Sequence, residues 1–347
     1  MPALSSIPRK KHSNSAYRNL GLQCGRLMAF FSLCGLFLIS FSFYKGSDIT
    51  AIISTIPQWI WASVLGMPAV LAWIFFRSKI GLVVFLLWTL YGITTLDSLP
   101  SIARTGMNQY KLPSHPGLQS WRIVTIDCRG MKNIPTAALA KLNADVIFLQ
   151  GARDPNQTVE MALTLFGNSA RARQIGTCAI ICSNGELSQV APIPDTESLM
   201  VDWIPRHSNL PIRLVNISLA HRQTKMNFLL PEHWKYYSKL RSFHRLEIDN
   251  ILNALKDQGN KVGNMPIIMA GNFNAAPSSS TFKSIGSNFL DVYRETGTGF
   301  GATTPAQFPI LRQNRIFTTS PLLPIHSDTV TIPGAIHKAV VSDISKH

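Results

Sequence analysis

The sequence predicts an α/β (α+β) domain that follows an apolar helical region. Past residue 120, short apolar segments typical of buried strands alternate with segments of helical periodicity, which is the pattern of a layered α/β fold. Before residue 97 the chain contains long uncharged stretches. Charged residues make up only 15% of the 347-residue chain, below the roughly 25% of an average soluble domain. One globular domain plus an apolar segment fits this length and composition.

Three apolar runs in the first third predict a transmembrane region at 27–96. They cover residues 27–44, about 56–76 and 80–96, and the first is uncharged throughout. A helix over the first run rises roughly 27 Å, close to the thickness of the hydrocarbon core of a bilayer. No small-residue cleavage site follows that run, which argues against a cleaved signal peptide. We therefore expect about three transmembrane helices in a multi-pass membrane protein.

The positive charges predict the orientation of these helices. Residues 1–26 form a basic tail without any acidic residue, and the connection between the second and third runs carries Arg77 and Lys79. Short loops rich in Lys and Arg stay in the cytoplasm. We therefore expect a cytoplasmic N-terminus and an extracytoplasmic C-terminal domain, on the periplasmic or outer side. Since the chain carries a formal charge of +15, a tail that binds nucleic acid is the alternative interpretation.

Residues 97–120 are expected to form a linker without a helix or strand, because Pro100, Pro113 and Pro116 stand there among small and polar residues. Residues 121–347 are expected to form the α/β domain. Its predicted strands, in chain order, cover residues 121–127, 144–150, 178–182, 212–220, 265–270, 315–318 and 339–344.

Two helices are predicted between these strands, at 135–142 and 233–255. The second carries a core-facing stripe at the i, i+3, i+4, i+7 spacing, formed by Ile248, Ile251, Leu252 and Leu255. Five cysteines, an odd number, indicate no disulfide framework. Cys178 and Cys182 fall on one face of their strand and are expected to be buried free thiols.

Six segments of the domain occur in a recognisable order, and they read WRIVTIDCRG, ADVIFLQGARD, VNISLAH, IIMAGNFNAAPSSS, RQNRIFTTSPLL and AIHKAVVSDI. In order and spacing they resemble the endonuclease/exonuclease/phosphatase superfamily, over residues 121–344. The membrane anchor in front resembles the bacterial membrane-bound branch. The resemblance implies a four-layer DNase-like sandwich, in which two face-to-face β-sheets are flanked by helices. It also implies a phosphodiester-cleaving site with a divalent metal, Mg²⁺ or Mn²⁺.

The metal site that this resemblance implies is depleted in this chain. Where active members carry a metal-contacting Asn, a metal-binding Glu and the Asp of a Gly-Asp-x-Asn motif, the chain has Asp127, Gly151 and Asn272. Asn314 replaces the Asp of an Arg-Ile-Asp motif, and Ile336 replaces the Asp of a terminal Ser-Asp-His. Four carboxylates are lost and one is gained, so the expected pocket is about three charge units more positive and unsuited to a hard cation.

His221, Asn274 and His337 match the family pattern and are the expected members of a degenerate catalytic site. In active members a histidine accepts a proton from the attacking water. Each residue also fits a structural role. The histidines can be hydrogen-bonded core side chains, and an asparagine can form a turn because it tolerates left-handed backbone geometry.

The expected ligand contacts are Asn272, Asn274, Asn314 and Asp127. No metal ligand set is expected, although Asp127 and Asp154 together could rescue divalent-metal binding. Restoring Glu or Asp at the four depleted positions is expected to rebuild a metal site. Only Ile336→Asp is expected to destabilise the fold, because that residue is expected in an apolar neighbourhood.

The sequence thus predicts a membrane-anchored extracytoplasmic protein that is impaired in, or lacks, metal-dependent phosphodiester hydrolysis and acts as a binding module. The alternative is an active phosphodiesterase, nuclease or phosphatase with a rearranged site and Mg or Mn as its cofactor. The expected partners are the membrane and a phosphate-containing anionic ligand or nucleic acid. The sequence does not identify a protein partner.

Overall fold

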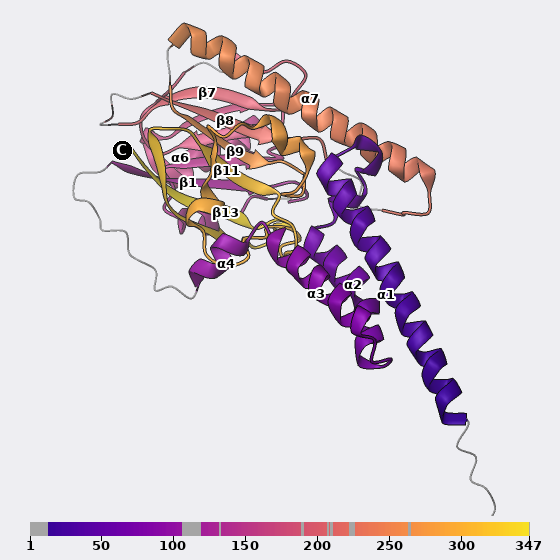
Figure 1. Ribbon diagram of the computed structural model, residues 1–347. Coiled ribbons are helices and arrows are strands. Elements are labelled where there is room, and N and C mark those ends of the chain that lie inside the picture. The colour runs from indigo at the N-terminus through magenta and orange to yellow at the C-terminus, as the bar shows by residue number, and fades with distance from the viewer. Residues whose placement is uncertain are drawn as a thin grey trace, which may run out of the picture. The chain divides into compact units, whose positions relative to one another are not determined.

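The computed structural model describes residues 13–105, 119–131, 133–188, 191–206, 208, 211–221, 226–262 and 265–346 (Figure 1). The chain divides into two compact units. The first consists of Met1–Lys45 and Gln58–Leu96, and the second of Gly46–Pro57 and Asp97–His347. The segment between the first two apolar helices therefore belongs to the second unit. The basic residues at positions 9 to 11 lie outside the described residues.

The first unit contains three apolar helices, α1 (Ser13–Lys45), α2 (Gln58–Ile74) and α3 (Lys79–Thr94). Each helix corresponds in sequence to one of the three predicted apolar runs. Among the described residues, one helix alone is long and apolar enough to cross a membrane, namely α1 over Asn19–Lys45. Helix α2 is shorter, with 17 residues, and α3 reaches the required length only when it is joined to α4 (Leu99–Thr105) as a broken span.

Helix α4 contradicts the expectation that residues 97–120 form no helix. Pro100 is the second residue of α4, and the first turn of a helix tolerates proline because its N–H groups have no intrahelical partner. Arg104 holds α4 in the second unit by donating from Nε to the carbonyl of Gly297 at 2.9 Å. Residues 106–118, the rest of the predicted linker, lie outside the described residues.

The second unit is built on two mixed β-sheets. One has the strand order β12-β13-β1-β2-β4-β3, and the other β10-β11-β9-β8-β7-β5 with β6 paired to β7. The strands of the first are β1 (Ser120–Asp127), β2 (Val146–Gln150), β3 (Arg171–Ile175), β4 (Cys178–Cys182), β12 (Leu322–Val330) and β13 (Ala339–Lys346). Those of the second are β5 (Glu186–Leu187), β6 (Ala191–Pro192), β7 (Leu199–Ile204), β8 (Ile212–Ser218), β9 (Ile267–Asn272), β10 (Leu290–Asp291) and β11 (Asn314–Thr318).

The helices cover the outer faces of the sheets. Helices α5 (Thr136–Ala140) and α6 (Pro155–Phe166) pack on the first sheet, where Leu139 and Met161 meet Ile147. Helix α7 (Pro231–Val262) crosses the second sheet, as Figure 1 shows, and buries Ile248 and Ile251 against its strands. The remaining short helices are α8 (Val292–Thr296), η1 (Asp48–Thr50), η2 (Ile53–Thr55), η3 (Gly167–Ser169) and η4 (Ser280–Ser284). Two sheets between two helical layers confirm the predicted sandwich.

The core between the sheets is apolar. Its largest members, Trp121, Phe148 and Trp203, come from both sheets and are at most 5% exposed. Cys178 and Cys182 lie in the same core as free thiols, as their spacing predicted. All the predicted strands exist within a few residues of their expected limits, whereas β3, β7, β12 and α6 were not predicted.

Candidate active-site region at the strand ends

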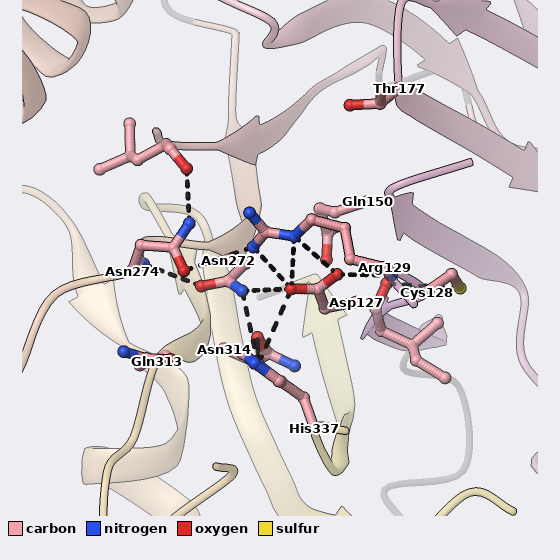
Figure 2. A network of polar contacts seen from close by, with 12 residues as sticks. Asp127, Cys128, Arg129, Gln150, Thr177, Asn272, Asn274, Gln313, Asn314 and His337 are labelled. Atoms are coloured by element: carbon pink, nitrogen blue, oxygen red, sulfur yellow. Dashed lines mark hydrogen bonds and ion pairs between the residues drawn. The ribbon is translucent and has the colours of Figure 1, made fainter. Parts of the chain in front are cut away.

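The candidate site lies where strands of both sheets end. Parallel pairing aligns Asp127 at the end of β1 with Gln150 at the end of β2. In the facing sheet, antiparallel pairing aligns Asn272 at the end of β9 with Asn314 at the start of β11. Strand pairing thus brings residues that lie far apart in the sequence to one edge of the sandwich (Figure 2).

A buried amide contact joins the two sheets beside this edge. The Gln150 Nε2 donates to Asn216 Oδ1 at 2.7 Å, and Asn216 Nδ2 donates to the carbonyls of Leu149 at 2.8 Å and Ala179 at 2.7 Å. Both amide side chains are fully buried. Since an unpaired buried amide is costly, these bonds fix the spacing of the sheets where the site is formed.

Four predicted residues meet in one buried network. Asn272 donates from Nδ2 to Asp127 Oδ2. The His337 Nδ1 lies 3.8 Å from Asp127 Oδ2, 3.3 Å from Asn314 Oδ1 and 3.4 Å from Asn272 Nδ2. All four residues are at most 3% exposed. Asp127 is therefore the central acceptor of the network.

Arg129 completes this network, although no sequence pattern predicted its role. Its Nε lies 3.0 Å and 2.9 Å from the two carboxylate oxygens of Asp127, its Nη2 lies 2.6 Å from Oδ2, and its backbone N–H donates to Oδ1 at 2.9 Å. Nη2 also donates to Asn274 Oδ1 at 3.3 Å. One sequence signal could have indicated this role, because Arg129 follows Asp127 by two residues. At that spacing an aspartate side chain can accept a hydrogen bond from the backbone N–H of the later residue.

The Asp127 carboxylate is held in its ionised form. Burial opposes ionisation, but the hydrogen bonds and charge of Arg129, with the charge of His337, outweigh it, so the pKa of Asp127 lies below its usual value. The guanidinium and the carboxylate thus form a paired charge within a largely buried site.

Asn274 forms the turn that was predicted for it and also contacts Arg129. Its backbone adopts a positive φ of 47°, which asparagine tolerates better than most residues. Its backbone N–H donates to Asn272 Oδ1 at 2.8 Å, and its Nδ2 donates to the carbonyl of Leu219. Asn274 is therefore both a turn residue and the contact that connects Arg129 with the loop after β8.

Gly151 leaves no space for the family's glutamate. Its φ is +75°, and a Cβ there would lie 2.5 Å from Arg129 Cγ and 2.7 Å from the backbone N of Arg129. Because the backbone is part of the obstacle, a rotation of the arginine side chain does not remove the clash. The expectation that Gly151→Glu is tolerated is therefore wrong.

Ile336 also differs from its expected environment. Its side chain is 45% exposed, so a carboxylate at this position is solvated. Asn272 is fully buried and in contact with Asp127, so an aspartate there places two carboxylates side by side. Ile336→Asp is therefore expected to be tolerated better than Asn272→Asp, which reverses the order expected from the sequence.

The donor set does not fit a divalent metal. Asp127 is already engaged by Arg129, and the other network members offer amides and one imidazole. Asp154 is exposed and caps α6, where its Oδ1 accepts from the Asn156 N–H at 2.9 Å. In the part of the chain that the structure describes, no group of three or more His, Cys, Asp or Glu side chains is arranged to hold a metal.

His221 lies outside the buried network, on an adjacent cleft of about 540 Å³. Arg129 lines the same cleft and so connects it with the network. The cleft is not uniformly positive. Its charged lining residues are Arg129, Arg153, Asp195, Glu197 and Glu247.

Glu247 on α7 is a second residue whose role no sequence pattern predicted. It is 4% exposed, and its Oε2 accepts from the Ala220 N–H at 3.2 Å. Burial, with a smaller contribution from the charge of Glu197, raises the pKa of Glu247 to about 7. One turn earlier, His244 donates from Nε2 to the carbonyl of Ala220 at 2.8 Å, and burial lowers its pKa to about 4. Such contacts depend on how α7 packs, which no local pattern reveals.

Comparison with known proteins agrees with this architecture. A solved endonuclease/exonuclease/phosphatase from Bacteroides vulgatus is 12% identical with a TM-score of 0.50, covering 66% of this chain and all of that one. A mannosyl-6-phosphatase from Bacteroides thetaiotaomicron is 13% identical with a TM-score of 0.49, covering 65% of this chain and 99% of that one. D. rerio TDP2 complexed with a single-strand DNA product is 15% identical with a TM-score of 0.46, covering 65% of this chain and 99% of that one.

At such identities a structural likeness concerns the fold alone. Among curated proteins, none matches the sequence. The endonuclease/exonuclease/phosphatase family matches residues 136–343, more than half of the chain. This match confirms the resemblance found in the sequence, and the chain belongs to the endonuclease/exonuclease/phosphatase family.

Proposed function

We propose that this protein is a membrane-anchored, extracytoplasmic family member that binds a phosphate-bearing ligand and lacks metal-dependent phosphodiester hydrolysis. The observation that carries the proposal is the guanidinium of Arg129, which contacts both Asp127 and Asn274. The guanidinium thus already binds the side-chain oxygens that a divalent metal ion would need as ligands.

Electrostatics disfavours a resident metal at this position. A divalent cation prefers several oxygen ligands, carboxylates among them, and it would have to displace a guanidinium from the one carboxylate of the network. Breaking a buried ion pair costs about 3–5 kcal/mol, because one charge is then left uncompensated. Gly151 contributes no ligand in return.

The same arginine supports phosphate binding. Its side chain is 24% exposed and lines the cleft. Among the described residues Nη1 has no hydrogen-bond partner, and Figure 2 shows it on the side of the guanidinium that faces away from Asp127. A guanidinium offers phosphate several N–H donors in a planar fork. Because acidic residues share the cleft, the proposed ligand carries its phosphate on a polar group that donates hydrogen bonds.

Two contacts within the second unit support the proposed topology. Asp48, three residues after α1, pairs with Arg245, and Asp97, three residues after α3, pairs with Arg312 Nη2 at 2.6 Å. The segments that follow α1 and α3 are therefore both held by the family domain. This favours a topology in which these two segments and the domain lie on the same side of the membrane. We propose a cytoplasmic tail at 1–26, three spans within 27–96, a connection at 97–120 and an extracytoplasmic domain at 121–347.

A second candidate, phosphoester hydrolysis without a resident divalent metal, is favoured by one observation. Glu247, whose pKa is raised to about 7, lines the same cleft as His221. A carboxyl that is half protonated near neutrality suits general acid–base chemistry.

The test of binding uses the full-length chain in detergent, with inorganic phosphate as the probe. Phosphate is expected to raise the melting temperature of the wild type by mass action. The double variant Asp127→Asn/Arg129→Gln, which removes the guanidinium without leaving an unpaired carboxylate, is expected to lose this shift. Arg171→Gln, at the one exposed residue of β3, is the matched control and is expected to keep it. A shift that survives in the double variant would refute the role of Arg129.

The test of hydrolysis uses a generic phosphodiester with millimolar Mg²⁺ or Mn²⁺. The wild type is expected to turn over no faster than His337→Ala. Metal-stimulated turnover that His337→Ala abolishes would overturn the proposal. Metal-independent turnover that Glu247→Gln abolishes would establish the second candidate instead.

A further inference from the structure

Two segments of the second unit, residues 46–57 and residues 226–240, form what we call the juxtamembrane surface. Large apolar side chains project from both segments. Leu229 is 89% exposed, Ile49 is 75% exposed and Leu230 is 38% exposed. Single exposed apolar residues are common on soluble proteins, but these three belong to two segments that pack together.

The two segments are fixed to each other within the second unit. Ala51 and Ile52 are buried against Tyr237. Thr55 donates from Oγ1 to Met226 Sδ at 3.1 Å, and Arg241 donates from Nη1 to the carbonyl of Ser47 at 2.9 Å. Segment 46–57 therefore forms a packed part of the domain.

Chain continuity relates this surface to the bilayer. Residues 46–57 begin directly after the last residue of α1 and stop directly before the first residue of α2. If α1 and α2 enter a membrane, a segment between them lies at its surface. Residues 226–240, which pack on that segment, then lie at the surface as well.

The composition of residues 226–240 suits the headgroup region. Trp234 stacks edge-on against Phe228 and donates from Nε1 to its carbonyl at 2.9 Å, and Tyr236 is half-buried beside it. Tryptophan and tyrosine concentrate at membrane interfaces because one end is apolar and the other polar. Lys235 and Lys239 are exposed and lie one turn apart on α7.

We propose that the juxtamembrane surface is seated on the lipid headgroup layer, with Leu229, Leu230 and Ile49 in the interface. Lys235 and Lys239 contact anionic headgroups, because such lipids attract basic side chains at the membrane surface. The inference rests on the proposed anchoring through α1 and α2, and it assigns a second, non-covalent contact between the domain and the bilayer.

The test measures membrane depth in the full-length chain in lipid nanodiscs, whose two faces are both open to solvent. Cys24 and Cys34 are replaced by serine, and the three other native cysteines are buried. Single cysteines are then introduced as Leu229→Cys, Ile49→Cys or Leu246→Cys and labelled with an environment-sensitive fluorophore. Leu246 is 51% exposed and lies about 22 Å along α7 from its first residue, so it is the matched control.

Iodide in the buffer is expected to quench the probe at 229 at least about fivefold less than the probe at 246, because an interfacial side chain lies within the headgroup region. Spin-labelled lipids are expected to show the reverse order. Raising the fraction of anionic lipid is expected to increase the difference, and Lys235→Gln/Lys239→Gln is expected to reduce it.

Equal quenching by iodide at 229 and 246 would overturn the inference. So would protection from iodide at 229 without quenching by spin-labelled lipids, since a protein then covers the surface. The probe at 49 separates this failure from failure of the anchor. If it is protected by lipid while 229 is not, the anchoring stands and the seating is wrong. If it is also unprotected by lipid, the membrane anchor itself is wrong.

Discussion

The buried network around Asp127 and the cleft beside His221 share Arg129 but differ in how their charged side chains are paired. In the network one carboxylate is matched by one guanidinium and surrounded by amides, so every strong charge has a partner. The cleft has two arginines and three acidic residues along its wall, and of these Glu247 is buried. The network thus has paired charges in a fixed geometry, whereas the cleft presents charges of both signs, which suit the polar ligand proposed above.

Removing the guanidinium tests the network most strongly. Arg129→Ala leaves Asp127 buried and unpaired and is expected to lower the free energy of unfolding by about 3–5 kcal/mol. Denaturant unfolding of the wild type and the variant measures this loss. Asp127→Asn/Arg129→Gln is expected to recover most of it. An Arg129→Ala variant as stable as the wild type would show that the pair contributes nothing to folding.

Filling the space at Gly151 tests how tightly the network is closed. Gly151→Ala is expected to cost roughly 2–4 kcal/mol, from backbone strain at a positive φ and from contact with Arg129. Gly130→Ala is a matched control, since Gly130 also has a positive φ but a Cβ there meets nothing within 4 Å. Equal costs in the two variants, measured by denaturant unfolding, would attribute the whole effect to backbone strain.

The cleft is expected to respond to pH through Glu247. Its pKa is raised from 4.5 to about 7 in the folded protein. Its contribution to stability is therefore fully present below pH 4.5 and is lost as pH rises through about 7. Glu247→Gln is expected to flatten the fall in unfolding free energy over this window, by about 1–3 kcal/mol. Unchanged pH profiles of the denaturation midpoint in the variant would exclude this assignment.

The smallest effect is expected at the edge of the site. Ile336→Asp places a carboxylate on a side chain that is 45% exposed, and substitutions at exposed positions usually change stability by less than about 0.5 kcal/mol. Thermal unfolding of this variant next to Gly151→Ala tests the inverted order of tolerance. A loss above that range at Ile336 would mean that the substitution disturbs His337 beside it.

Sequence patterns predicted the parts of the fold that depend on local periodicity. The apolar runs of β2, β4 and β9 and the stripe on α7 lie where they were expected. β12 was missed because LLPIHSDTV contains a proline and has no regular alternation of apolar residues. The sequence does contain the N-terminal signal of α6, with Asp154 as the cap and Pro155 at the first position.

The candidate site was predictable only in part. Strand-end positions brought Asp127, Asn272, Asn314 and His337 together, as family resemblance implied. The role of Arg129 depends on its tertiary contact with Asn274, and that of Glu247 on how α7 covers the second sheet. Neither contact leaves a periodic signal in the sequence.

The close packing of Gly151 against Arg129 limits how this site can change over generations. A glutamate at 151 collides with the backbone at 129, and loss of the arginine leaves a buried carboxylate without its partner. Either of these two changes taken alone thus gives a destabilised protein, and destabilised intermediates are removed by selection when stability is marginal. A glutamate at position 151 therefore requires at least two concerted changes. The packing of Gly151 against Arg129 thus opposes the stepwise return of this metal ligand.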